Sequence, residues 1–304
     1  MNNTMSTEEN EVNFFPLFDG LGVADASARL KNIVKRTPLE LNRNLSQKYQ
    51  CNIFLKREDL QVVRSYKLRG AYNMLSTLPA DQLKQGVVCA SAGNHAQGFA
   101  YSCKKLNCKG MVFMPVITPR QKVSQTKMFG ENNVEVQLVG DSFEECAEAA
   151  LKYTKENNKT FIPPYDNYKI IEGQATVGLE ILEDLTHVDY LFVPVGGGGI
   201  ASGVGSYFKT FSPVTKIIGV EPAGAPSMSE AFKEGHPVTL QNIDHFVDGA
   251  SVSRAGDITY KICKEVLNEM HLVPEGKVCT TILQLYNEDA ILAEPAGALS
   301  IAAL

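Results

Sequence analysis

Short apolar runs alternate with amphipathic segments of helical length along most of this sequence. The apolar runs predict strands at 53–56, 86–90, 111–115, 134–139, 190–195 and 216–221. The amphipathic segments predict helices at 69–76, 95–106, 119–129, 142–156, 173–182, 200–211 and 227–234. Val, Ile and Phe run through the strands without regular polar alternation, which is typical of strands buried on both faces. This pattern predicts an α/β protein with a mostly parallel sheet covered by helices.

The charge of the chain excludes two classes of partner. The formal net charge is −5, and the five acidic residues among the first 28 positions account for all of it, because no Lys or Arg lies there. The rest of the chain is balanced and offers no basic surface for nucleic acid. No apolar run approaches the roughly 20 residues that a membrane helix needs. We therefore expect neither a nucleic-acid nor a membrane partner.

The cysteines and the N-terminus indicate a cytoplasmic protein. The seven cysteines are widely spaced and include no CxxC pair, as expected for reduced thiols. Residues 1–25 are expected to form a loose leader, and its lack of basic residues does not match a secretory or mitochondrial signal. We expect no metal site, because metal-ligand spacing is lacking among His187, His236, His245 and His271.

Lys67 is the first candidate functional residue. It lies in the segment SYKLRGA at residues 65–71, just before a predicted helix. A lysine with basic neighbours in a loop is usually a solvated surface residue. A functional lysine instead requires burial or a nearby charge that lowers its pKa, so that the free amine can attack a carbonyl group. Both interpretations remain open from this segment alone.

The turn SAGNHAQG at residues 91–98 is the second candidate, and it joins a predicted strand to a predicted helix. Small residues there allow backbone N–H groups to approach an anion, and a helix N-terminus favours negative charge. The turn is therefore suited to a carboxylate or a phosphate. Ser and Asn are also common helix caps, so a well-capped turn without a ligand is an equal alternative.

Four consecutive glycines at 196–199 form the third candidate. Glycine costs roughly 0.5–1 kcal/mol relative to alanine in regular structure, so a simple turn would not need four. A phosphate-binding loop of backbone N–H groups is the better explanation. The segment also fits the dinucleotide fingerprint Gly196-x-Gly198-x-x-Ala201, with Glu221 at the end of the next strand, which would indicate a nicotinamide-binding protein. Its late position and the other two motifs argue against that alternative.

Together, these motifs resemble those of the fold type II pyridoxal-phosphate enzymes, and within them the biosynthetic threonine dehydratases. The resemblance extends from about residue 28 to residue 304. Its segments are RTPL at 36–39, KRED at 56–59, SYKLRGA at 65–71, SAGNHAQG at 91–98, PVGGGGI at 194–200, FVDGA at 246–250 and AEPAGA at 293–298. In this order and spacing they are highly specific.

The resemblance implies two α/β domains built on two open, mostly parallel, twisted sheets covered by helices. The larger domain would comprise residues 26–81 and 163–304, and the smaller domain, residues 82–162, would be inserted in it. The cofactor, pyridoxal 5'-phosphate, would bind between them. The resemblance also implies a homo-oligomer, either a dimer or a tetramer.

The resemblance further implies a role for each candidate residue. Lys67 would form the Schiff base with the cofactor and act as the catalytic base. The substrate carboxylate would be bound by Ser91, Ala92, Gly93, Asn94 and His95, and Asn94 would also contact the phenolic oxygen of the cofactor. The phosphate would be held by Gly196, Gly197, Gly198, Gly199 and Ile200. The implied reaction converts L-threonine into 2-oxobutanoate and ammonia, the first step toward isoleucine, with L-serine as a secondary substrate.

Alternatives remain open because related enzymes share these motifs and because this chain departs from the family pattern in two ways. Serine racemases and catabolic serine/threonine dehydratases share the lysine and glycine motifs, and some carry a cation site, but residues 221–227 contain Glu221 without a second acid. The partner of the cofactor's ring nitrogen would lie beyond Leu304, as would an isoleucine-sensing regulatory domain. The final predicted helix, which begins near Pro295, lacks a closing residue, which indicates a truncated chain. Such a chain could be catalytically impaired, and we expect its rate not to respond to isoleucine.

Overall fold

The computed structural model describes residues 21–304. Most of the predicted leader therefore lies outside the described residues, and its last positions, 21–25, belong to helix α1 (Leu21–Leu30). Helix α1 packs against helices α3 (Lys67–Ser76) and α8 (Tyr168–Asp184) of the main body.

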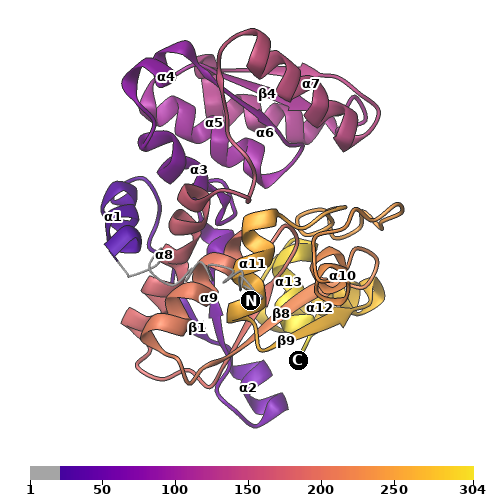
Figure 1. Cartoon of the computed structure of the whole chain (residues 1–304). Coiled ribbons are helices and arrows are strands. Elements are labelled where there is room, and N and C mark those ends of the chain that lie inside the picture. Colours follow the sequence, from indigo (N-terminus) through magenta and orange to yellow (C-terminus); the bar gives the residue numbers. More distant parts are fainter. Residues whose placement is uncertain (1–20) are drawn as a thin grey trace, which may run out of the picture.

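A four-stranded parallel sheet forms the core of the unit at the top of Figure 1. Its strands, in spatial order, are β5 (Val134–Leu138), β4 (Gly110–Met114), β3 (Val87–Ala90) and β6 (Thr160–Phe161). Its helices are α4 (Ala80–Gln85), α5 (Asn94–Leu106), α6 (Arg120–Gly130) and α7 (Phe143–Glu156). On one face Val87 packs in a cluster with Phe99 of α5, and on the other Val88 packs with Cys146 of α7. Strand β3 is thus buried on both faces, as its apolar sequence predicts.

A three-stranded parallel sheet forms the core of the lower unit, in the order β7 (Tyr190–Pro194), β8 (Lys216–Pro222) and β9 (Glu269–Val273). Its helices are α8, α9 (Gly199–Phe211), α10 (Ser227–Glu234), α11 (Asp257–Val266), α12 (Glu275–Asp289) and α13 (Pro295–Ala302). Ile217 belongs to the apolar cluster around Phe208 of α9, whereas Ile218 belongs to the cluster around Leu299 of α13. Helices therefore cover both faces of β8.

Helix α3 lies between the two units (Figure 1). It follows an antiparallel pair, β1 (Leu39–Leu41) and β2 (Phe54–Lys56), which encloses α2 (Arg43–Tyr49), and the short 3₁₀ turn η2 (Glu58–Leu60). A second 3₁₀ turn, η3 (Glu131–Asn133), follows α6. Because α3 packs against α5 above and α8 below, its first residue lies where the two units meet.

The structure confirms the predicted α/β class with parallel sheets, and each predicted strand and helix is present, most of them with somewhat different ends. The helix predicted at 173–182 begins earlier, at Tyr168, because the side chain of Asn167 accepts a hydrogen bond from the N–H of Lys169 (2.8 Å) and caps it. The sequence pattern missed α1, α2, α4, α11, α12, β1, β6 and β9. Strand β9 is exposed at Glu269 and Leu272, so it lacks a continuous apolar run.

The four-stranded sheet lies within the predicted smaller domain, and the three-stranded sheet lies within the predicted larger one. The boundaries at 82 and 163 remain a prediction. Among residues 21–304, no helix is long and apolar enough to cross a membrane.

Candidate active site

Lys67 begins helix α3 and lies on the wall of a cavity of about 1790 Å³. Its Nζ atom donates a hydrogen bond to the backbone oxygen of Pro164 (3.1 Å) and lies 5.5 Å from the ring centroid of Tyr66. Burial lowers the pKa of Lys67 to about 8, although the negative charge of Glu294 opposes the shift. The lysine therefore has the buried setting that a reactive amine requires.

The turn at residues 91–95 lines the same cavity. The first backbone N–H groups of α5 have no partner within the helix, so they are available to an anion. The imidazole of His95 is engaged elsewhere, because its Nε2 atom donates to the backbone oxygen of Ile162 (3.0 Å). Burial and the charge of Lys67 lower the pKa of His95 to about 3, so the ring is neutral. His95 can thus serve an anion through its backbone N–H and not through its ring.

The glycine loop at 196–199 also lines this cavity and connects β7 to α9. Gly198 has a φ of 89°, in the left-handed region that favours glycine. A Cβ atom at Gly197 would lie 2.3 Å from the ring of Tyr165, so only glycine permits this close approach. The hydroxyl of Thr259 donates to the backbone oxygen of Gly197 (2.6 Å) and holds the loop in place. The first N–H groups of α9, including that of Ile200, lack helical partners and suit a second anionic group.

Replacing Gly197 with alanine is expected to destabilise the protein by about 1–3 kcal/mol, because the new methyl group collides with Tyr165. Displacement of the loop should also weaken phosphate binding by about tenfold or more, as misaligned charged hydrogen bonds would. Urea unfolding and an equilibrium titration with inorganic phosphate measure the two effects. The control is Gly276→Ala, since nothing lies within 4 Å of a Cβ at Gly276 and no loss is expected. Equal behaviour of the two variants would contradict the argument.

Tyr165, Asp166 and Thr259 hold the site together, and the sequence alone carried no signal for them. The carboxylate of Asp166 accepts hydrogen bonds from the backbone N–H groups of Asp257, Ile258 and Thr259, at 2.9–3.1 Å, and caps α11. A capping motif within the sequence could not have revealed this contact, because the capped helix begins 91 residues later. The hydroxyl of Tyr165 similarly donates a hydrogen bond to the distant backbone oxygen of Arg254, at 3.0 Å.

Glu221 is not available to bind the ribose of a nicotinamide cofactor, as the nicotinamide alternative would require. It is fully buried, with an exposed fraction of 0%. Its carboxylate accepts hydrogen bonds from the backbone N–H groups of Met228 (2.7 Å) and Ser229 (2.9 Å) and from the hydroxyl of Ser229 (2.7 Å). Burial raises the pKa of Glu221 to about 7. Because its oxygens are occupied by the start of α10, Glu221 is not placed to bind a ribose.

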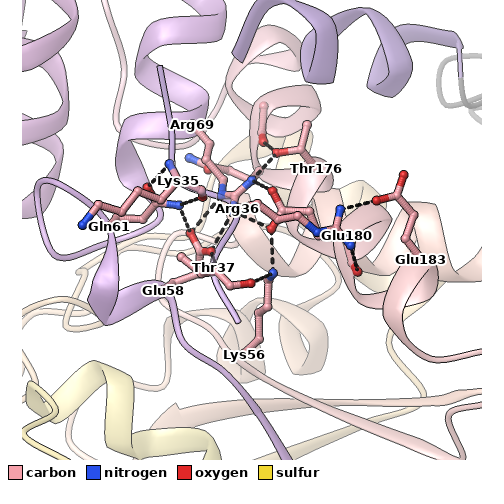
Figure 2. A network of polar contacts seen from close by, with 12 residues as sticks. Lys35, Arg36, Thr37, Lys56, Glu58, Gln61, Arg69, Thr176, Glu180 and Glu183 are labelled. Atoms are coloured by element: carbon pink, nitrogen blue, oxygen red, sulfur yellow. Dashed lines mark hydrogen bonds and ion pairs between the residues drawn. The ribbon is translucent and has the colours of Figure 1, made fainter. Parts of the chain in front are cut away.

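A buried polar network secures the helix that carries Lys67 (Figure 2). The guanidinium of Arg69 donates to both carboxylate oxygens of Glu58 (2.8 and 2.9 Å) and of Glu180 (2.7 and 2.9 Å). Lys56 donates to Glu180 as well (2.6 Å). Burial alone would lower the pKa of Arg69, but the carboxylates outweigh it and raise that pKa. The network ties α3 to α8, β2 and η2, and so sets where α3 begins.

A family model described as "Pyridoxal-phosphate dependent enzyme" matches residues 30–304. The chain belongs to this family. The family member named "L-threonine dehydratase biosynthetic IlvA" from Halalkalibacterium halodurans is 56% identical to it over 280 residues, which cover 92% of this chain and 68% of that protein. The family resemblance predicted from the motifs is thereby confirmed.

Two solved structures have the same fold. The processed form of threonine deaminase isoform 2 from Solanum lycopersicum matches with a TM-score of 0.90 and 41% identity, over 95% of this chain and 83% of that chain. The serine racemase from Dictyostelium discoideum matches with a TM-score of 0.85 and 28% identity, over 93% of this chain and 90% of that chain. The identity is therefore higher to the threonine deaminase than to the racemase.

The cofactor of this family is pyridoxal phosphate, and the residues of the cavity fit it. The cavity brings together an amine with a lowered pKa and the N-termini of α5 and α9. The hydroxyls of Ser65 and Ser251 also line it, and within residues 21–304 they have no hydrogen-bond partner. Such buried polar atoms normally have a partner, which a bound polar molecule would supply.

The rate at which the cofactor-free chain takes up pyridoxal phosphate is expected to fall in acid. If Lys67 forms the Schiff base that the resemblance implies, only its unprotonated amine would attack the cofactor aldehyde, and burial lowers its pKa to about 8. The rate should therefore level off above roughly pH 9 and fall about tenfold for each pH unit below roughly pH 7. Stopped-flow absorbance at constant ionic strength measures this profile. A rate that levels off only above the ordinary lysine pKa would show that burial does not lower the pKa of Lys67.

Proposed function

We propose that this chain catalyses the dehydration and deamination of L-threonine to 2-oxobutanoate and ammonia, with L-serine as a secondary substrate that gives pyruvate. The observation that carries the proposal is one cavity that is lined by Lys67 and by the N-termini of two helices. An amino acid and a phosphorylated cofactor each bring one anionic group to such a cavity. The substrate itself is supported by the 56% identity to a protein named L-threonine dehydratase.

Each candidate residue has a role in this proposal. The backbone of the turn formed by Ser91, Ala92, Gly93, Asn94 and His95 binds the substrate carboxylate. The backbone of Gly196, Gly197, Gly198, Gly199 and Ile200 binds the cofactor phosphate. Asn94 contacts the phenolic oxygen of the cofactor through its side chain. When bound, the cofactor delocalises the negative charge that develops at the substrate α-carbon.

Lys67 moves the proton in this proposal. It anchors the cofactor before the substrate arrives, and its free amine then removes the α-proton of the substrate. A pKa near 8 keeps a useful fraction of the amine unprotonated close to neutral pH. The ion pair between Lys122 of α6 and Asp248 of the lower unit borders the same cavity, and helps to separate the bound substrate from water.

The proposed function is tested by incubating the purified chain and pyridoxal phosphate with L-threonine or L-serine. Formation of 2-oxobutanoate is followed with a coupled reductase, and ammonia is measured separately. A higher kcat/KM for L-threonine than for L-serine is expected. Chiral chromatography of the L-serine reaction tests the alternative, because a racemase would accumulate D-serine. Racemisation without 2-oxobutanoate from L-threonine would overturn the proposal.

We further propose that the chain acts in the cytoplasm as a homo-oligomer with a small-molecule amino-acid substrate. All seven cysteines are unpaired, as suits a reducing compartment. The family resemblance supports a dimer or a tetramer. Sedimentation velocity of the cofactor-loaded chain tests the assembly, and a monomer at micromolar concentration would contradict it.

A further inference from the structure

Asn94 and Glu294 contact each other across the cavity between the two units. The Nδ2 atom of Asn94 donates a hydrogen bond to Oε1 of Glu294 at 2.7 Å, although the residues are 200 positions apart. Asn94 begins α5 in the upper unit, and Glu294 immediately precedes α13 in the lower unit. Both residues line the cavity together with Lys67. The hydrogen bond thus connects the two units directly at the site.

The carboxylate of Glu294 is not used to cap its own helix. Glu294 is the N-cap residue of α13, yet its side chain accepts no capping hydrogen bond there. It lies instead beside the loop at 248–249, where a Cβ atom at Gly249 would be 3.3 Å from Oε1 of Glu294 and 3.8 Å from Nδ2 of Asn94. Glu294 is exposed, but partial desolvation at the cavity wall and the charge of Asp248 raise its pKa, although Asn94, Lys122 and Lys67 oppose this. The carboxylate therefore faces Asn94 and this loop, and not the start of its own helix.

This contact determines how the carboxamide of Asn94 is oriented. Because Nδ2 faces the carboxylate, Oδ1 faces away from it, and one N–H of Nδ2 remains available to a ligand. An asparagine without such a partner could rotate its carboxamide and exchange its donor for its acceptor. The backbone of α5 is also restrained, since Asn94 is the first residue of the turn that offers N–H groups to the cavity.

We propose that Glu294 is a positioning residue, whose hydrogen bond holds the carboxamide of Asn94 and the first turn of α5 in the arrangement that binds cofactor and substrate. This inference rests on the proposed function for its effect on turnover. Its effect on the conformation of α5 does not depend on the reaction and can be measured in the cofactor-free chain.

The test compares Glu294→Ala, Glu294→Gln and Ser253→Ala. The glutamine variant keeps an oxygen acceptor for Nδ2 of Asn94 and removes only the charge. Ser253 provides the matched control, because its hydroxyl donates to Oε1 of Glu144 (3.1 Å) and forms another contact between the units. Amide hydrogen exchange of residues 91–99 is measured in each cofactor-free chain. The dissociation constant for pyridoxal phosphate, kcat and KM are then measured for each variant.

Glu294→Ala is expected to speed amide exchange at residues 91–99 and to weaken cofactor binding by about tenfold, as the loss of a charged hydrogen bond would. Its kcat for L-threonine should fall by about 10²-fold, with a smaller change in KM, because the reacting groups are misplaced. Glu294→Gln should restore exchange and binding to within about threefold. Ser253→Ala should leave both unchanged. If the alanine variant does not fold, Glu294→Asp replaces it, since the shorter side chain cannot keep the 2.7 Å contact.

Two results would overturn the inference. If Glu294→Gln exchanges and binds cofactor as poorly as Glu294→Ala, the charge of Glu294 matters and its hydrogen bond to Asn94 does not. If Ser253→Ala has the same effects as Glu294→Ala, the effects come from general loosening between the units. A wild-type chain that converts no L-threonine would refute the proposed function alone. Amide exchange would still decide the role of Glu294 in that case.

Discussion

Replacing Lys67 with alanine is expected to lower the conversion of L-threonine by a factor of about 10³ or more. In the proposed function the variant loses two roles together, because the same amine would anchor the cofactor and remove the substrate α-proton. The fold should persist, since among residues 21–304 the side chain of Lys67 loses one hydrogen bond, from Nζ to the backbone oxygen of Pro164. Removing the amine of Lys67 from the cavity wall should not lower the free energy of unfolding, because burial already disfavours the charged form of this amine.

Three measurements test the prediction for Lys67→Ala. The coupled assay for 2-oxobutanoate gives the rate, the visible absorbance of the protein–cofactor mixture reports covalent attachment, and circular dichroism gives the melting temperature. Lys152→Ala is the control, because Lys152 is exposed and pairs with the exposed Glu156 of α7. This control should match the wild type in all three measurements. Turnover of Lys67→Ala within tenfold of the control would show that another group performs the chemistry.

Replacing Arg69 with alanine is expected to lower the free energy of unfolding by about 3–5 kcal/mol. The guanidinium is fully buried and is paired with the carboxylates of both Glu58 and Glu180. Without it, two carboxylates remain in a mostly buried space, and Lys56 pairs with that of Glu180. An uncompensated buried charge accounts for most of the expected loss, since the net contribution of an intact buried pair is smaller.

Urea unfolding followed by circular dichroism measures the loss. Arg36→Ala is the matched control, because the guanidinium of Arg36 pairs with Glu183 and Asp184 at the surface, with 49% of its side chain exposed. An exposed pair of this kind contributes about 0–1 kcal/mol. If the two arginine variants lose the same stability, the ion pairs of Arg69 with Glu58 and Glu180 do not have the strength that their burial implies.

The same network explains why Lys67 was ambiguous in the sequence. The segment SYKLRGA carries two cations within three positions, which is typical of an exposed loop. The structure buries Arg69 against Glu180, which lies 111 positions away, and this places Lys67 on the cavity wall. Burial, and hence the lowered pKa, depends on that distant partner. No local pattern contains this information.

For the glycine loop as well, the sequence predicted one part of the arrangement, and only the tertiary structure revealed the rest. Four successive glycines predicted a close backbone approach, and the loop indeed lies at the start of α9. The sequence could not show that the ring of Tyr165 requires a glycine at position 197, or that Thr259 holds the loop from another helix. It also suggested a dinucleotide fingerprint ending at Glu221, which the structure instead uses to cap α10.

The sequence by itself determined the α/β class, the positions of the strands with continuous apolar runs, and the turns that open α5 and α9. These features depend on neighbours within a few residues, where hydrophobic periodicity and helix-capping chemistry act. Only the tertiary structure decided which side chains meet in the cavity, the protonation of Lys67 and His95, and the contact between Asn94 and Glu294. Desolvation and hydrogen bonding between segments up to 200 positions apart set these properties, and they arise only when the two units pack together.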